Sequence, residues 1–398
     1  MVTPFAGLLY EPSVAGSMES LTAPPYDQVS PLEERRYREA SPFNVVHLDL
    51  GEGRRDGDPS ERHARAGRLL GEWRRRGVLA STGAAAVYPY EMRFVHDGSG
   101  RRVRGVIAAV DLEPWGGSIV PHERTLLGPV EDRLELLRSV HANLSAIYAV
   151  FDGPSEELRR LLDEATRAPA ARRVADEGGT VHSLWVAPEL GREVTALFAH
   201  APLLIADGHH RYAVALAFRD EMRASHGPGP WDQVMMLIVD GAAEDPPVLP
   251  FHRIVSRPLP PPARSRRVRD LQEVLAGLRD EEPVVGMAER SSGELTHRLI
   301  ELDGPPPAVR ALHAQLLPEV TEDRIRYVPD AVEAEASVRD TGGHVAYFLP
   351  ASTVARIRSA ISAGQRLPEK STYFWPKPRT GMIIRPHDPT GTHSATGV

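Results

Sequence analysis

The sequence Leu203-Leu204-Ile205-Ala206-Asp207-Gly208-His209-His210-Arg211-Tyr212 places a short apolar run before an Asp-Gly turn and an alanine-rich segment. This order predicts a strand, a tight turn and the start of a helix. The first amides of a helix have no partner inside it, and the helix dipole is positive at that end. The stretch therefore predicts an anion-binding junction, to which His209, His210 and Arg211 would add their side chains. The alternative is an ordinary turn with solvated histidines at a helix start.

Composition excludes several classes of protein. The chain has 398 residues, of which 41% are hydrophobic and 25% charged, so we expect more than one folded domain. No apolar run of about 18 residues predicts a membrane span. The chain has no cysteine, which excludes disulfides and cysteine-ligated metals. With a net charge of −7 and no secretion signal in Met1–Tyr10, we expect a cytoplasmic protein without a nucleic-acid partner.

Mixed strand and helix patterns predict an α+β fold rather than a regular doubly wound sheet. We expect a core α+β domain over residues 1–256, a C-terminal α+β region over 264–386 that packs back on the core, and a disordered tail at 387–398. Local patterns also predict a helix from Pro31 with Ser30 as its N-cap, a strand at 44–50, a hairpin turning at 96–100, a helix at 267–279 and a last strand at 381–385.

A second polar cluster, Pro121-His122-Glu123-Arg124-Thr125, lies between a predicted strand and a predicted helix. Loops of this kind often carry catalytic groups. A carboxylate there would accept the proton of a substrate hydroxyl or hold a divalent cation. The alternative is a helix-capping loop with surface charges. Asp27, next to Tyr26 on a loop stiffened by two prolines, is a second candidate for the base.

A third cluster runs from Lys370 to Lys377, where two lysines flank the aromatic run Tyr373–Trp375. Aromatic runs more often belong to a core than to a base-stacking platform. The two lysines, in contrast, are candidates to meet a phosphate. The pair His252-Arg253 is a weaker candidate.

Several familiar catalytic motifs do not occur in the sequence. It has no P-loop, no GxGxxG after a strand and no GxSxG elbow. Glu123 does not continue into an HExxH motif. On a helix, His209 and His210 would point about 100° apart, which makes them a poor pair of metal ligands.

Seven ordered motifs make the chain similar to a large bacterial family of unknown function, number one thousand and fifteen. They are Ala23–Asp27, Asn44–Leu48, Pro121–Arg133, Asn143–Ser145, Ala206–Tyr212, Leu249–Arg253 and Lys370–Phe374. The resemblance covers about residues 4 to 386. Two positions depart from the family pattern: Val130 stands where a lysine is usual, and Ala146 where a proline is expected. If that lysine contacts a phosphate or an acidic substrate, its replacement bears on the substrate of this chain.

The Asp-Gly-His-His-Arg element also resembles the phosphate-binding motif of free serine kinases, which have a ParB/sulfiredoxin-like fold. This resemblance implies a mixed-sheet core of that fold and a site for ATP or ADP with Mg²⁺. Gly208, His209, His210 and Arg211 would bind the nucleotide phosphates, and Asp207 would act in catalysis and hold the metal. The implied reaction transfers a phosphoryl group to the hydroxyl of a small molecule, and serine or a related amino acid is the expected acceptor.

The kinase hypothesis also assigns roles to residues of the other clusters. Glu123 is the expected catalytic base, with Asp27 as second choice. Expected substrate-binding residues are Tyr26, His122, Arg124, Lys370 and Tyr373. The sequence leaves the donor nucleotide and the oligomeric state open.

Two other functions remain open at this stage. The chain would be a ParB-like switch if it hydrolysed its nucleotide slowly and acted through a partner, although its negative charge argues against a DNA-bound version. It would be a metal-dependent hydrolase if His122, Glu123, His209 and His210 formed a metal centre.

Overall fold

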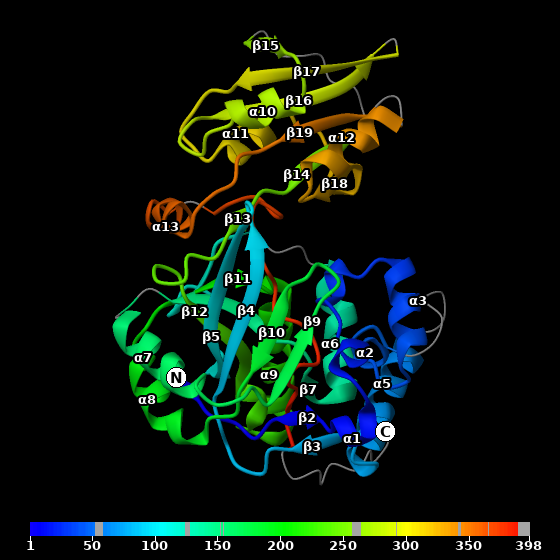
Figure 1. Cartoon of the computed structure of the whole chain (residues 1–398), viewed down its shortest axis with the longest axis vertical. Coiled ribbons are helices and arrows are strands. Elements are labelled where there is room, and N and C mark those ends of the chain that lie inside the picture. Colours follow the sequence, from blue (N-terminus) through cyan, green and yellow to red (C-terminus); the bar gives the residue numbers. More distant parts are fainter. Residues whose placement is uncertain are drawn as a thin grey trace. The chain divides into compact units, whose positions relative to one another are not determined.

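The computed structural model describes residues 1–51, 59–123, 128–151, 153, 155–256, 264–291, 293–340, 344–364 and 366–388. The chain divides into two compact units (Figure 1). Unit 1 contains Met1–Pro121, Thr125–Asp245 and Pro376–Val398, and unit 2 contains His122–Arg124 and Pro246–Trp375. The predicted division at residues 256 and 264 stays a prediction. Of the predicted tail, His387 is buried and Asp388 pairs with Arg74, while the rest lies outside the described residues.

The elements of unit 1 come from all three of its segments. Its strands are β1 (Val2–Thr3), β2 (Leu8–Tyr10), β3 (Leu79–Ser81), β4 (Tyr88–His96), β5 (Ser99–Asp111), β6 (Ile119–Pro121), β7 (Ala142–Asn143), β8 (Ile147–Phe151), β9 (Arg172–Ala175), β10 (Val181–Leu184), β11 (Leu203–Asp207), β12 (Gln233–Asp240) and β21 (Arg385–Pro386). Its helices are α1 (Pro12–Ala15), α2 (Met18–Leu21), η1 (Tyr26–Gln28), α3 (Pro31–Ala40), α4 (Val46–Asp49), α5 (Pro59–Arg75), α6 (Gly128–Val140), α7 (Ser155–Ala165), η2 (Pro188–Leu190), α8 (Gly191–Leu197), α9 (His209–His226) and η3 (Pro230–Asp232).

A mixed sheet organises unit 1. Its strand order is β6–β11–β8–β12–β5–β4–β10–β9, and β1 pairs with β5. β11 runs parallel to β6 and β12 runs parallel to β8, whereas the other neighbours are antiparallel. Mixed strand directions together with helices confirm the predicted α+β class.

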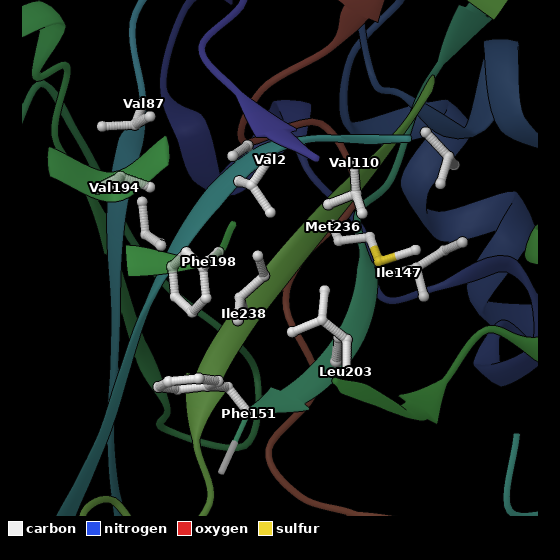
Figure 2. Close-up of a cluster of buried hydrophobic side chains, with 14 of the residues drawn as sticks. Val2, Val87, Val110, Ile147, Phe151, Val194, Phe198, Leu203, Met236 and Ile238 are labelled. Atoms are coloured by element: carbon white, nitrogen blue, oxygen red, sulfur yellow. The ribbon is translucent and has the colours of Figure 1, made fainter. Parts of the chain in front are cut away.

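One hydrophobic core holds the sheet of unit 1 against α7 and α8. Figure 2 shows sheet residues such as Ile147, Met236 and Ile238 gathered with Phe198, which follows α8. Phe151 meets Phe198 edge-on, with ring centroids 4.9 Å apart. Burying such a side chain contributes about 1.5–3 kcal/mol. Because Leu203 and Ile205 belong to the same core, the packing also fixes the position of β11.

Helix α9 is packed on two sides, which sets its direction from the end of β11. Tyr212 and Ala215 join the core of the sheet. Val214 and Phe218 pack instead with Leu137 of α6. A helix with apolar residues on both of these faces has little freedom to rotate, so its first turn is held in a defined place.

Unit 2 is an antiparallel sheet with helices on it. Its strands are β13 (Val248–Leu249), β14 (His252–Val255), β15 (Ser265–Val268), β16 (Val284–Ser291), β17 (Glu294–Glu301), β18 (Ile325–Val328), β19 (Val345–Phe348) and β20 (Tyr373–Phe374), and its helices are α10 (Leu271–Gly277), α11 (Ala308–Gln315), η4 (Glu322–Arg324), α12 (Ala331–Asp340) and α13 (Val354–Ser362). The strand order of the sheet is β15–β17–β16–β19–β14–β18, and β13 pairs separately with β20. One buried cluster contains α11 and another contains α10 and α12.

Two local predictions are confirmed with their expected chemistry. Ser30 caps α3, because its hydroxyl accepts from the amide of Glu33 while the Glu33 side chain accepts from the amide of Ser30. β4 and β5 form the predicted hairpin, and Asp97 and Gly98 make its turn with φ of 48° and 72°. Positive φ at both turn residues matches the right-handed twist of the strands.

One local prediction is wrong, and two others have the wrong bounds. The predicted strand at 44–50 is replaced by α4 at Val46–Asp49, because the Asn44 side chain accepts from the amide of Val46 and starts a helical turn. The helix predicted at 267–279 begins only at Leu271, after Asp270 as its cap, and residues up to Val268 belong to β15. The last strand covers only β21. Among helices in the described part of the chain, none is both long and apolar enough to span a bilayer.

Candidate active site

The junction between β11 and α9 has the predicted order of strand, turn and helix. Gly208 lies between them as the N-cap of α9, in the left-handed conformation with φ of 100°. A Cβ at this position would lie 3.0 Å from Nε and from Nη2 of Arg211. Both the backbone angle and the approach of the guanidinium therefore require glycine here.

Arg211 is held in place by three hydrogen bonds within unit 1. Its Nη2 donates to Oδ2 of Asp207 at 2.7 Å. Its Nη1 donates to Oγ of Ser145 at 2.9 Å and to the carbonyl of Ala146 at 2.7 Å. Part of the guanidinium is thus engaged in hydrogen bonds within the protein. The contact of Arg211 with a phosphate stays a prediction. The arrangement also gives Arg211 a second role, which is to orient Asp207.

Lys377 brings a second cation to Asp207. Its Nζ lies 2.5 Å from Oδ1 of Asp207 and 3.7 Å from Oδ2 of Asp27, and the lysine side chain is only 5% exposed. Asp27 belongs to η1, directly after a Pro-Pro pair. We call Asp27, Asp207, Arg211 and Lys377 the ion cluster. It places two carboxylates and two cations beside the first turn of α9.

His209 and His210 occupy that first turn, and His209 is buried. They belong to unit 1, whereas His122 and Glu123 belong to unit 2. Within the described residues, no group of three His, Asp or Glu side chains is arranged to hold a metal ion. The four residues of the hydrolase hypothesis therefore form no such group.

A second set of charged residues lies on α4 and α6. The guanidinium of Arg133 lies over the ring of Tyr26 at 4.6 Å, and its Nη1 donates to the carbonyl of Asp49 at 2.5 Å. Burial is the main reason why the pKa of Tyr26 is raised to about 12, so the phenol keeps its proton at neutral pH. Burial also raises the pKa of Asp49, against the opposing effect of Arg133 and Arg211.

Asp132 anchors Arg133. Its Oδ2 accepts from Nε and Nη2 of Arg133 at 3.0 and 2.7 Å, while Oδ1 lies 3.0 Å from Nε2 of His63 and 2.6 Å from Nη2 of Arg62. The hydrogen bond from His63, helped by Arg133, holds the pKa of Asp132 well below its usual range. The position of Arg133 thus depends on α5 as well as on α6.

A pocket of about 70 Å³ opens within unit 1 between these two sets of charges. Tyr26, Asp49, Arg133, Ser145 and Arg211 form its polar end. Its remaining wall is mostly aliphatic and comes from α6, α9, β12 and the segment around β7 and β8. Arg211 therefore belongs to both the ion cluster and the pocket.

Glu123 has a structural environment in unit 2. Its Oε1 accepts from the amides of Ser371 and Thr372 at 3.0 and 2.9 Å and from the Thr372 hydroxyl at 2.9 Å, and its Oε2 accepts from the amide of Lys370 at 3.0 Å. His122 contacts the same hydroxyl, with Nε2 at 2.6 Å from Oγ1. Both oxygens of the Glu123 carboxylate are therefore engaged by the loop at 370–372. The predicted role of Glu123 as base stays a prediction that this geometry does not favour.

The predicted substrate-binding residues are divided between the units. Tyr26 lines the pocket of unit 1. In unit 2, the Lys370 ammonium lies over the ring of Phe251 at 5.6 Å, and Tyr373 meets the same ring edge-on at 5.2 Å. Arg124 lies outside the described residues. Val130, where the family pattern has a lysine, packs against the apolar cluster of α6 and α9.

Sequence reasoning missed several residues of this site. Lys377 is one of the two lysines in the cluster from Lys370 to Lys377, and the sequence does not indicate which of the two contacts Asp207. Arg133 and Ser145 stand in recognisable motifs but were assigned no role. Asp49 carried no signal, since it lies in a segment that was predicted to be a strand. Proximity in space was the missing information in each case.

The sequence matches a family model described as “Protein of unknown function (DUF1015)” over residues 2–312. No curated protein matches it. Similar solved structures include a free serine kinase in complex with AMP, with 14% identity over 67% of this chain and 86% of that chain and a TM-score of 0.38. A conserved hypothetical protein from Pyrococcus furiosus has 13% identity over 68% of this chain and 93% of that chain, with a TM-score of 0.37. A C-terminally truncated SbnI from Staphylococcus aureus has 11% identity over 69% of this chain and 85% of that chain, with a TM-score of 0.36. Likenesses this distant do not bear on activity.

Proposed function

This chain belongs to the family described as a protein of unknown function (DUF1015), and we propose that it is a nucleotide-dependent kinase of small-molecule hydroxyl groups. The acceptor we propose is serine or a related amino acid, and the core we propose is ParB/sulfiredoxin-like. The ion cluster carries the proposal, because Lys377 Nζ lies 2.5 Å from Asp207 and 3.7 Å from Asp27 beside the start of α9. Phosphoryl transfer needs cations against the phosphates and a carboxylate near the attacking hydroxyl.

The residues of the ion cluster fit a nucleotide with Mg²⁺. Lys377 and Arg211, with Gly208 and the first turn of α9 that carries His209 and His210, would hold the phosphates of ATP or ADP. Carboxylate oxygens are hard ligands that magnesium takes together with substrate phosphates, and Asp207 would supply them. When bound, the metal ion would neutralise charge on the phosphates.

We assign the base to Asp27 in preference to Glu123. Asp27 lies in unit 1 with Asp207 and Lys377, whereas Glu123 is engaged by a loop of unit 2. In the proposed step, the acceptor oxygen forms a bond to the terminal phosphorus, and the bond from that phosphorus to the bridging oxygen of the nucleotide breaks. The hydroxyl proton moves to the carboxylate of Asp27.

The test compares two arginines of α9. Arg211→Lys keeps the positive charge but loses the planar fork that reaches Asp207 and Ser145 together, so we expect phosphorylated product to fall by about 100-fold. Arg219→Lys is the matched control, since the Arg219 side chain is 11% exposed against 14% for Arg211 but donates to the carbonyl of Leu112 and pairs with Asp220. Product is measured by mass spectrometry after incubation with ATP, ADP or CTP and a pool of amino acids.

Two results would count against the kinase. Near-normal turnover in Arg211→Lys would show that the ion cluster does not take part in the reaction. Nucleotide binding by the wild-type chain without any phosphorylated product would favour the ParB-like switch instead. Circular dichroism on both variants confirms that they are folded.

A further inference from the structure

The pocket of unit 1 adjoins the ion cluster through two shared elements. Arg211 lines the pocket and at the same time donates to Asp207. In η1, Tyr26 lines the pocket while its neighbour Asp27 lies 3.7 Å from Lys377. A molecule in the pocket would therefore lie beside the groups that we assign to phosphoryl transfer.

The size of the pocket limits its occupant. An apolar cavity of about 150 Å³ holds a benzene ring. At about 70 Å³, the inner space of this pocket holds roughly half as much, which suits a few carbons of an aliphatic chain whose charged groups stay at the polar end. Its walls contain the apolar side chains of Leu136, Val140, Val214, Ala215 and Val234. An aliphatic segment that enters the pocket would therefore not deprive these side chains of any hydrogen bond.

The polar end of the pocket suits a carboxylate. Arg133 and Arg211 each make three hydrogen bonds within the described part of unit 1. A guanidinium carries further N–H donors beyond these, and its geometry favours carboxylates. The Ser145 hydroxyl lies at the same end and can donate as well as accept. Asp49 adds a carboxylate that would meet an ammonium group.

We propose that this pocket is the acceptor subsite of the kinase proposed above, and that it takes the carbon chain of a hydroxy amino acid of about three to five carbons, whose charged groups lie at the polar end. The carboxylate of the acceptor lies against Arg133 and the Ser145 hydroxyl, its ammonium group faces Asp49, and its methylene groups contact the aliphatic walls. Its hydroxyl points to the ion cluster, where Asp27 takes the proton. This inference rests on the proposed function for the reaction but makes its own claim about binding.

The pocket predicts a preference among acceptors. Because its walls are aliphatic, L-homoserine and L-threonine should be better acceptors than L-serine, by about the 10-fold that one methylene contributes in an apolar pocket. The methyl esters of these amino acids lack the carboxylate charge and should be poor ligands. These probes are titrated calorimetrically into the full-length chain, with and without ADP.

Filling the pocket tests it directly. Ala215→Leu places a larger side chain in the wall and should raise the KM of the preferred acceptor at least about 10-fold. The dissociation constant of ADP should stay within about twofold. Ala224→Leu is the matched control, because Ala224 lies on the same helix with its side chain exposed.

A second variant works in the opposite direction, in case the leucine disturbs the core. Val214→Ala enlarges the pocket and should improve the binding of an acceptor with one more methylene than the wild type prefers. Thermal melting of all three variants separates loss of fold from loss of the subsite.

The outcomes separate this proposal from the proposed function. Acceptor binding that Ala215→Leu abolishes and Ala224→Leu preserves supports the subsite, even if no phosphorylated product forms; only the kinase would then fail. Product formation that Ala215→Leu leaves unchanged overturns the subsite and leaves the kinase standing. A weaker affinity for ADP in Ala215→Leu, with acceptor binding unchanged, would assign the pocket to the nucleotide and also overturn the proposal.

Discussion

Single charged residues in unit 1 owe their positions to partners that lie far away in the sequence. Asp207 meets a lysine 170 residues later, and Asp132 meets Arg62 and His63 about 70 residues earlier. Each of these carboxylates is shared by two or more cations, so its charge is compensated even where it is partly buried. The guanidiniums that line the pocket are oriented by the same carboxylates.

Asp132 makes stability depend on pH in a defined direction. Because its pKa is lowered in the folded chain, its contribution is present above the unfolded pKa of about 4 and is lost as pH falls through the lower folded value. We expect Asp132→Asn to lower the free energy of unfolding by about 1 kcal/mol at neutral pH, a figure reduced because the side chain is 40% exposed. Urea unfolding should show this difference shrinking below about pH 4.

Asp220→Asn serves as the control for this prediction. Asp220 also pairs with an arginine, but its side chain is 68% exposed. Its replacement should change stability little at any pH. A deficit of Asp132→Asn that stays constant into acid would contradict the assigned role of Asp132.

At the scale of elements, α9 links the site to the core. Its first turn carries the histidines, and its apolar faces contact both the sheet and α6. A glycine with positive φ stands at each end: Gly208 at the start and Gly227 just after the last residue. The two glycines differ in one respect, since a Cβ at Gly227 would meet nothing within 4 Å whereas one at Gly208 would meet Arg211.

This difference predicts different effects of the same substitution. Gly208→Ala and Gly227→Ala should each lower the free energy of unfolding by about 1 kcal/mol, because alanine is strained at positive φ. Gly208→Ala alone should reduce formation of phosphorylated product, since it pushes Arg211 away from Asp207. Equal losses of product in both variants would mean that helix stability, and not the position of Arg211, limits activity. Denaturant unfolding and mass spectrometry measure the two effects separately.

On the scale of the whole molecule, the chain enters unit 2 and returns to unit 1 before its end. Residues from Pro376 onward belong to unit 1 and contribute Lys377 to the ion cluster. Ile384 is fully buried there and bridges to Leu8 of β2. The C-terminal segment is therefore part of the core of unit 1, and the site depends on both ends of the sequence.

Removing the buried side chain of Ile384 should loosen unit 1. We expect Ile384→Ala to cost about 2–4 kcal/mol and to speed hydrogen exchange in peptides of α9 and β12. Ile361→Ala, in α13 of unit 2, removes the same atoms from a half-buried position and should cost less without changing exchange in α9. Faster exchange confined to unit 2 in Ile384→Ala would show that the segment does not stabilise unit 1.

Local patterns were sufficient for much of the secondary structure. The cap at Ser30, the turn at Asp97 and Gly98 and the start of α9 at Gly208 each follow from a residue type whose preference is set by its own backbone. The pattern was wrong at residues 44–50, where the Asn44 side chain accepts from the amide of Val46 and the buried residues of α4 follow in a helical turn. Apolar residues in a segment this short do not distinguish a strand from a helix.

The sequence by itself determined that a strand ends in Asp207 and that a helix starts after Gly208, because both depend on neighbouring residues. Only the tertiary structure decided that Lys377 meets Asp207, and that Glu123 instead binds the loop at 370–372, across 247 to 249 residues. Pairings over such distances depend on strand order and on which segments share a core. Neither is encoded in a local pattern, so residues such as Asp207 and Arg211 could be predicted from the sequence but their partners could not.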